Sequence, residues 1–105
     1  MRERWTTRAT PFADAYVAGL AASAVDALKL GRGRATDYLA VSFATLDKVG
    51  HDFGPDSHEV QDVLFHLDRE IGRLLDKLDR EVGRESYTLA LSADHGVSPT
   101  PERVA

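Results

Sequence analysis

The sequence predicts an α/β fold whose elements follow the order helix, strand, helix, strand. Two segments carry apolar residues at the three- and four-residue spacing of an amphipathic helix, and two short runs are almost continuously apolar. Because the second helix lies between the two runs, these three elements form one βαβ unit, with parallel strands and a right-handed crossover. The 105 residues suffice for one small domain, and no linker divides them.

The first predicted helix spans residues 11–30. Thr10 can act as its N-cap, and Pro11 suits the first helical position, where a missing N–H costs nothing. Gly31 and Gly33 are expected to end it. Its apolar residues at helical spacing are Phe12, Tyr16, Val17, Leu20, Ala21, Ala24 and Leu28.

The first predicted strand covers residues 37–45, with the sequence DYLAVSFAT. The run is too short for a typical helix and is rich in residues that favour strands. Its nearly continuous apolar character indicates a parallel strand covered on both faces. Residues 47–57, which contain two glycines and a proline, are expected to form a loop.

The second predicted helix gives the strongest periodic signal in the chain. Asp56 or Ser57 can cap it, and Asp56 with Glu59 has the spacing of a capping box. Gly83 is expected to end the helix. Its continuous apolar stripe consists of Val60, Val63, Leu64, Leu67, Ile71, Leu74, Leu75, Leu78 and Val82.

The second predicted strand covers residues 87–93, and residues 94–105 form a closing loop. Two parallel strands make a poor sheet, since such strands normally lie inside a larger one. We therefore expect residues 1–105 to be a single partial domain within a larger α/β domain. In isolation, the unpaired strand edges are expected to cause self-association or partial disorder.

Composition excludes several classes of protein. The absence of cysteine excludes disulfides, thiolate metal sites and cysteine nucleophiles. With 13 basic against 17 acidic residues, the chain lacks the basic footprint of a nucleic-acid-binding protein. It also lacks an apolar run of the roughly 18 residues that a transmembrane segment needs. No address signal is present, so the cellular location stays unknown.

An Asp/His pair follows each predicted strand. Asp47 and His51 follow the first strand, and Asp94 and His95 follow the second. Because ligands of open α/β sheets bind at the carboxyl ends of the strands, all four side chains are expected to face one crevice. Either pair alone is common in loops, but matched pairs in one βαβ unit indicate a metal site. Imidazole nitrogen and carboxylate oxygen suit zinc and similar divalent metals.

Several motifs together resemble the alkaline phosphatase superfamily. They are DKVGH at 47–51, GPDSHEV at 54–60, LD at 67–68 and SADHGV at 92–97. Within the superfamily, the pattern is most similar to the branch of type I phosphodiesterases, nucleotide pyrophosphatases and PafA-like phosphatases. The resemblance extends from Thr10 to Glu102 and implies a fragment of an alkaline-phosphatase-like core.

The resemblance implies two divalent metals, zinc in this family. Asp47 and His51 match the ligands of one metal, and Asp94 and His95 match ligands of the second. Asp52 also lies near His51, but only Asp47 matches the motif. The implied reaction is hydrolysis of a phosphate mono- or diester through a phosphorylated Thr or Ser. That nucleophile matches no residue of this chain, so we expect the chain to be inactive alone.

Two alternatives stay open at this point. The chain could be a non-catalytic α/β interaction domain or metal-binding remnant, whose long amphipathic helix docks onto a partner. It could also belong to a phosphonate-cleaving hydrolase of the same superfamily. The substrate of the complete enzyme is expected to be a small phosphate ester, and relatives are often periplasmic, secreted or membrane-associated.

Overall fold

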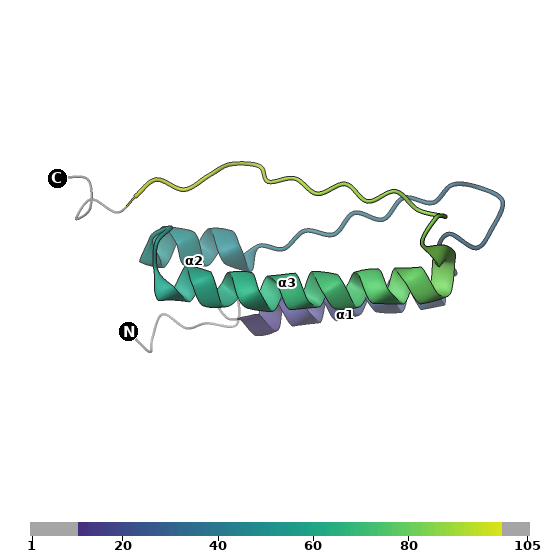
Figure 1. Cartoon of the computed structure of the whole chain (residues 1–105), viewed down its shortest axis with the longest axis horizontal. Helices are drawn as coiled ribbons and strands as arrows, with labels where there is room; N and C mark the ends of the chain where they lie inside the picture. The colour runs from purple at the N-terminus through teal and green to yellow at the C-terminus, as the bar shows by residue number, and fades with distance from the viewer. Residues whose placement is uncertain (1–10, 100–105) are drawn as a thin grey trace.

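The computed structural model of the chain describes residues 11–99, which contain three α-helices and one π-helical turn. Helix α1 packs along α3, and α2 packs beside the N-terminal part of α3 (Figure 1). Two extended segments run over the helices. The helical elements are α1 at Pro11–Ala27, α2 at Thr45–Phe53, α3 at His58–Leu78 and the π-helix η3 at Asp79–Gly83.

The predicted α/β fold is wrong for residues 11–99, because they contain no β-strand and therefore no βαβ unit. The first predicted strand, residues 37–45, is extended only as far as Phe43, and the second, residues 87–93, is extended throughout (Figure 1). Both run in the same direction, from the C-terminal end of α3 towards α2 (Figure 1). No backbone hydrogen bond joins the two segments within the described residues. A strand requires a hydrogen-bonded neighbour, and neither segment has one.

Apolar side chains of both extended segments are consequently exposed. Tyr38 is 90% exposed, and Leu91 is 81% exposed. Runs of this composition are typical of strands that are buried in a sheet. The prediction of two buried strands is therefore wrong, because residues 37–45 and 87–93 form no ladder within the part of the chain that the structure describes.

Helix α1 covers Pro11–Ala27, and Pro11 is the first residue that the structure describes; the predicted cap Thr10 lies outside the described residues. It ends at Ala27, three residues before the predicted end at Leu30. The chain then turns through Gly31, whose φ of 75° favours glycine.

The buried face of α1 differs from the predicted apolar stripe. Ala18, Ala21 and Val25 are buried against α3 together with Asp14, whereas Phe12 is 77% exposed. Small side chains at this spacing allow the two helix backbones to approach closely. The bulkier stripe residues that stay exposed are Phe12, Tyr16, Leu20 and Leu28.

Helix α2 occupies much of the segment that was predicted to be a loop. Its apolar residues Leu46, Val49 and Phe53 are spaced by three and four and face α3. Val49 forms a small core with Val60 and Val63 of α3. Since these three valines are at least 92% buried, their packing holds α2 in place.

Helix α3 is confirmed, and its cap is Ser57. The backbone N–H of Val60 donates to Ser57 Oγ at 3.1 Å, which is the contact expected of an N-cap side chain. The π-helix ends at Gly83 with a φ of 105°, as predicted for the end of the helical stretch. None of the helices described here is both long and apolar enough to span a bilayer.

Candidate metal centre

Asp47 and His51 lie one turn apart on the exposed side of α2. The spacing of four residues places both side chains on the same helix face. His51 Nε2 lies 3.0 Å from Asp47 Oδ1. The site is therefore partly preformed by a single helix, whose opposite face packs on α3.

His95 completes the cluster from the second extended segment. Its Nε2 atom lies 3.0 Å from the same Asp47 Oδ1. The rings of His51 and His95 are 5.8 Å apart between centroids. Ligand atoms of the three residues all lie within 4.8 Å of one another. Residues far apart in the sequence thus converge on one point.

Close packing between Gly50 and Val97 brings the two segments together. Gly50 is buried in α2, and a Cβ atom added there would lie 3.2 Å from Val97 Cγ2. A larger residue at position 50 would therefore push the segment around Val97 away from α2. His95 lies two residues before Val97, so this contact helps to set its distance from α2.

A backbone contact orients the imidazole of His95. Its Nδ1 lies 2.7 Å from the carbonyl oxygen of Gly96. With Nδ1–H donating to this carbonyl, Nε2 is free to act as a ligand, as in many metal-binding histidines. The Gly96 hydrogen bond is the largest cause that raises the pKa of His95, and the charge of Asp94 raises it further. Burial lowers this pKa, and the charge of Asp47 makes the smallest contribution, which raises it.

The other carboxylates lie less centrally. Asp94 Oδ1 is 3.8 Å from His95 Nε2, and its side chain is 89% exposed. Asp94 therefore lies at the rim of the cluster that the other three predicted ligands form. Asp52, the competing carboxylate, pairs instead with Lys48 at 3.2 Å.

The donor set fits a divalent metal. Two imidazole nitrogens and a carboxylate oxygen are ligands that zinc accepts, and three protein ligands are usual for open catalytic zinc sites. The side chains of Asp47, His51 and His95 are 47–57% exposed, so solvent and a small ligand can reach them. The identity of the metal and the assignment of the four predicted ligands stay predictions.

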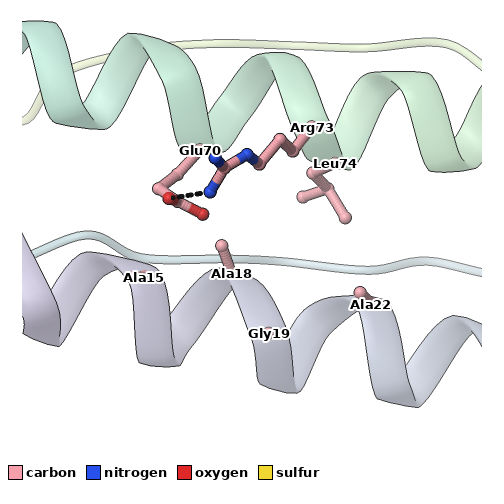
Figure 2. Close-up of a pocket in the computed structure, with 7 residues that line it drawn as sticks. All are labelled: Ala15, Ala18, Gly19, Ala22, Glu70, Arg73 and Leu74. Carbon is pink, nitrogen blue, oxygen red and sulfur yellow. Dashed lines mark hydrogen bonds and ion pairs between the residues drawn. The ribbon is translucent and has the colours of Figure 1, made fainter.

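A shallow groove between α1 and α3 is separate from this cluster. Figure 2 shows small residues of α1 facing the Glu70–Arg73 ion pair of α3, in which Arg73 Nη1 donates to Glu70 Oε1 at 2.9 Å. None of the predicted metal ligands lines it. The lining residues are Ala15, Ala18, Gly19, Ala22, Glu70, Arg73 and Leu74.

The sequence analysis did not identify two buried polar residues, one on α1 and one at the start of α2. Asp14 of α1 and Thr45, the first residue of α2, are each 1% exposed. A signal was available, because Asp14 lies at helical spacing from the buried residues Ala18, Ala21 and Val25. A carboxylate on the buried face of a helix indicates a specific polar contact.

Comparison with known proteins gives a consistent result. A family model described as type I phosphodiesterase / nucleotide pyrophosphatase matches residues 1–105. The chain is 42% identical over 91 residues to the alkaline phosphatase PafA of Elizabethkingia meningoseptica, covering 87% of this chain and 17% of PafA. It is 40% identical over 91 residues to the alkaline phosphatase PhoV of Synechococcus elongatus, covering 87% of this chain and 16% of PhoV.

The structural comparison agrees. The crystal structure of wild-type PafA matches with a TM-score of 0.75 and 40% identity, over 77% of this chain and 16% of that chain. The chain thus spans about one sixth of the length of these relatives.

Proposed function

The chain belongs to the type I phosphodiesterase / nucleotide pyrophosphatase family within the alkaline phosphatase superfamily, and on this premise we propose that it supplies metal ligands to a phosphoric ester hydrolase. The observation that carries the proposal is the convergence of Asp47, His51 and His95, with both histidine Nε2 atoms 3.0 Å from one carboxylate oxygen.

We propose that four side chains of this chain bind two divalent metal ions, and zinc is the metal that we expect. Asp47 and His51 would hold one ion, and Asp94 and His95 would contribute to the second. A bound zinc ion polarises phosphoryl oxygens and neutralises developing negative charge. The Gly96 carbonyl keeps the His95 ring oriented for this role.

The charge of the cluster makes substrate binding depend on the metal. Asp47 and Asp94 carry negative charge and would repel a phosphate ester in the absence of a cation. The half-exposed histidines leave the centre open to a small substrate from solvent. We therefore propose that phosphate binding and metal binding occur together at this site.

The remaining catalytic groups are not assigned to this chain. In the proposed phospho-enzyme reaction, a Thr or Ser hydroxyl attacks phosphorus, and we assign that role to none of residues 1–105. This fits a segment that spans about one sixth of the length of its relatives. We propose that residues 1–105 form one part of a larger hydrolase domain.

The proposal is tested with the full-length protein, which is stripped of metal and reloaded with zinc. We expect hydrolysis of p-nitrophenyl phosphate that requires zinc and is abolished in Asp47→Ala and in His95→Ala. The pair Asp62 and His66 on α3 provides a matched control. It has the same spacing of four residues and a separation of 3.6 Å, but no third ligand lies beside it within residues 11–99.

Zinc content should fall in the Asp47→Ala and His95→Ala variants and stay unchanged in Asp62→Ala and His66→Ala. Full activity and full zinc content in Asp47→Ala would overturn the assignment. If the wild type neither binds zinc nor hydrolyses a phosphate ester, the non-catalytic interpretation holds instead. Turnover of a phosphonate alone would favour the phosphonate-cleaving alternative.

A further inference from the structure

Residues 54–57 connect α2 to α3, and the hydroxyl of Ser57 forms hydrogen bonds towards both helices (Figure 1). Ser57 Oγ donates to the carbonyl oxygen of Gly54 at 2.8 Å and accepts the backbone N–H of Val60 at 3.1 Å. The backbone N–H of Ser57 also points to the Gly54 carbonyl, at 3.3 Å. A serine hydroxyl has one donor and two acceptor positions, so it can form both bonds at once. Capping of α3 therefore uses only the acceptor side of this group.

Gly54 carries the link into the last turn of α2. It is the C-cap of that helix, and its N–H donates to the carbonyl oxygen of Gly50 at 2.9 Å. Gly54 is buried and has a φ of 88°, which favours glycine. The last turn of α2 contains His51. A continuous series of hydrogen bonds thus joins the first turn of α3 to the turn of α2 that bears this candidate ligand.

The same junction also contains the apolar contact between the two helices. The side chain of Val60 packs with Val49 of α2 in the small core, and both residues are buried. Apolar packing has no directional preference, whereas a hydrogen bond requires its donor and acceptor to be aligned. The valines therefore hold α2 against α3, and the bonds of Ser57 set the orientation of its C-terminal end.

We propose that Ser57 is a positioning residue for the metal centre, whose hydroxyl fixes the last turn of α2 and with it His51. This inference rests on the proposed function. Helix α2 has nine residues, and helices this short depend on tertiary contacts for their stability. Its N-cap residue, Ala44, makes no side-chain capping bond within residues 11–99. Fraying of the last turn would move His51 Nε2 away from Asp47 Oδ1, which now lies 3.0 Å from it.

Three substitutions at position 57 separate the two bonds of the hydroxyl. Ser57→Ala removes both of them. Ser57→Asp keeps an acceptor for the first turn of α3, because Asp is a good N-cap, but its ionised side chain has no proton to donate to Gly54. Ser57→Thr keeps donor and acceptor, and threonine suits the extended φ of −79° and ψ of 157° at this position. Asp56→Ala, at the exposed neighbouring residue, is the control.

Zinc affinity, the denaturant midpoint and amide hydrogen exchange of residues 51–54 in metal-free protein are measured for each full-length variant. We expect zinc binding about fivefold weaker in Ser57→Ala and in Ser57→Asp, as for the loss of one hydrogen bond. The Gly54 N–H should exchange faster in both variants. Ser57→Asp should keep most of the stability that Ser57→Ala loses, since α3 is still capped. Ser57→Thr and Asp56→Ala should match the wild type in zinc affinity and in exchange.

The charge introduced by Ser57→Asp works against the expected result. A new carboxylate near the cluster attracts cations, so weaker zinc binding in this variant cannot be an electrostatic effect. Wild-type zinc affinity and wild-type exchange at Gly54 in Ser57→Asp would overturn the inference, because capping of α3 would then account for everything that Ser57 does. Equal loss of affinity in Ser57→Thr and Ser57→Ala would overturn it as well, since the hydroxyl would not be the cause.

Failure of the proposed function gives a different pattern. If the wild type binds no zinc, or if Asp47→Ala binds zinc as well as the wild type, the metal centre fails and the positioning role fails with it. Unchanged zinc affinity in Ser57→Ala and Ser57→Asp, together with loss of zinc in Asp47→Ala, would overturn the role of Ser57 and leave the proposed function intact.

Discussion

His95 Nε2 lies 3.0 Å from Asp47 Oδ1, although the two residues come from elements far apart in the chain. Asp47 belongs to helix α2, and His95 follows an extended segment that no other strand supports within residues 11–99. The contact therefore depends on how closely residues 95–97 pack on α2.

Enlarging Gly50 should separate the two halves of the cluster. An added Cβ would already lie 3.2 Å from Val97 Cγ2, so the bulkier side chain of Gly50→Val should displace the segment that bears His95. We expect weaker zinc binding, measured by competition with a chromogenic chelator. Adding Val97→Ala to Gly50→Val should recover much of the affinity, and a double variant no better than Gly50→Val would contradict this packing role.

Loss of the Ser57 cap should destabilise α3. Val60 N–H donates to Ser57 Oγ, so Ser57→Ala leaves this partly buried donor without its acceptor. We expect a loss of about 1 kcal/mol in the free energy of unfolding, measured by denaturant titration. The neighbouring variant Asp56→Ala is the control and should change stability much less. Equal effects of the two variants would mean that Ser57 is not the cap.

Gly31 should tolerate no side chain. Its φ is 75°, and an added Cβ would lie 2.7 Å from Val82 Cγ1. Gly31→Ala should therefore cost about 1–3 kcal/mol of stability, since strain and steric overlap combine. Gly33→Ala is the matched control because nothing lies within 4 Å of its added Cβ. Thermal unfolding of both variants measures the difference, and Gly31→Ala should have the lower melting temperature. Similar melting temperatures would refute the prediction.

The pH dependence of stability should report on Asp14. Burial raises its pKa above the ordinary value of 3.8, hydrogen bonds from Thr45 lower it, and the charge of Glu70 raises it. The folded state therefore binds this proton more tightly than the unfolded state. Stability must fall as the pH rises from the unfolded pKa through the raised folded pKa.

Asp14→Asn removes this titration. Relative to wild type, the variant should become progressively more stable as the pH rises through that window. Denaturant titrations at several pH values measure the difference in the free energy of unfolding. A difference that stays constant with pH would show that the pKa of Asp14 is the same in the folded and unfolded protein.

Helix α3 was predictable from sequence because its periodicity, cap and terminal glycine agree. The apolar spacing from Val60 to Val82 predicted a helical stretch, Ser57 caps it, and Gly83 ends the π-helix that follows α3. Of the stripe residues on α3, the structure buries Val60 and Val63 and leaves Leu64 exposed. The resemblance to the family was also confirmed by the match over residues 1–105.

The remaining errors have physical causes. The apolar runs at 37–45 and 87–93 have the composition of buried strands. A strand also needs a hydrogen-bonded neighbour, and the composition of one segment does not show whether such a neighbour is present. Helix α2 was not predicted because Gly50 and Gly54 indicated a loop. Gly50 is in fact a buried residue of the helix, and its lack of a side chain lets Val97 pack closely against it. The buried face of α1 follows its small residues, not its largest apolar ones.

The most direct test of the central claim is a crystal structure of the zinc-loaded full-length protein with an anomalous difference map at the zinc edge. We predict one anomalous peak about 2.0–2.2 Å from His51 Nε2, with Asp47 as a second ligand, and another about 2.0–2.2 Å from His95 Nε2, with Asp94 as a second ligand. Zinc bound elsewhere, with Asp47, His51 and His95 contacting no metal, would contradict the claim that these residues form one metal centre.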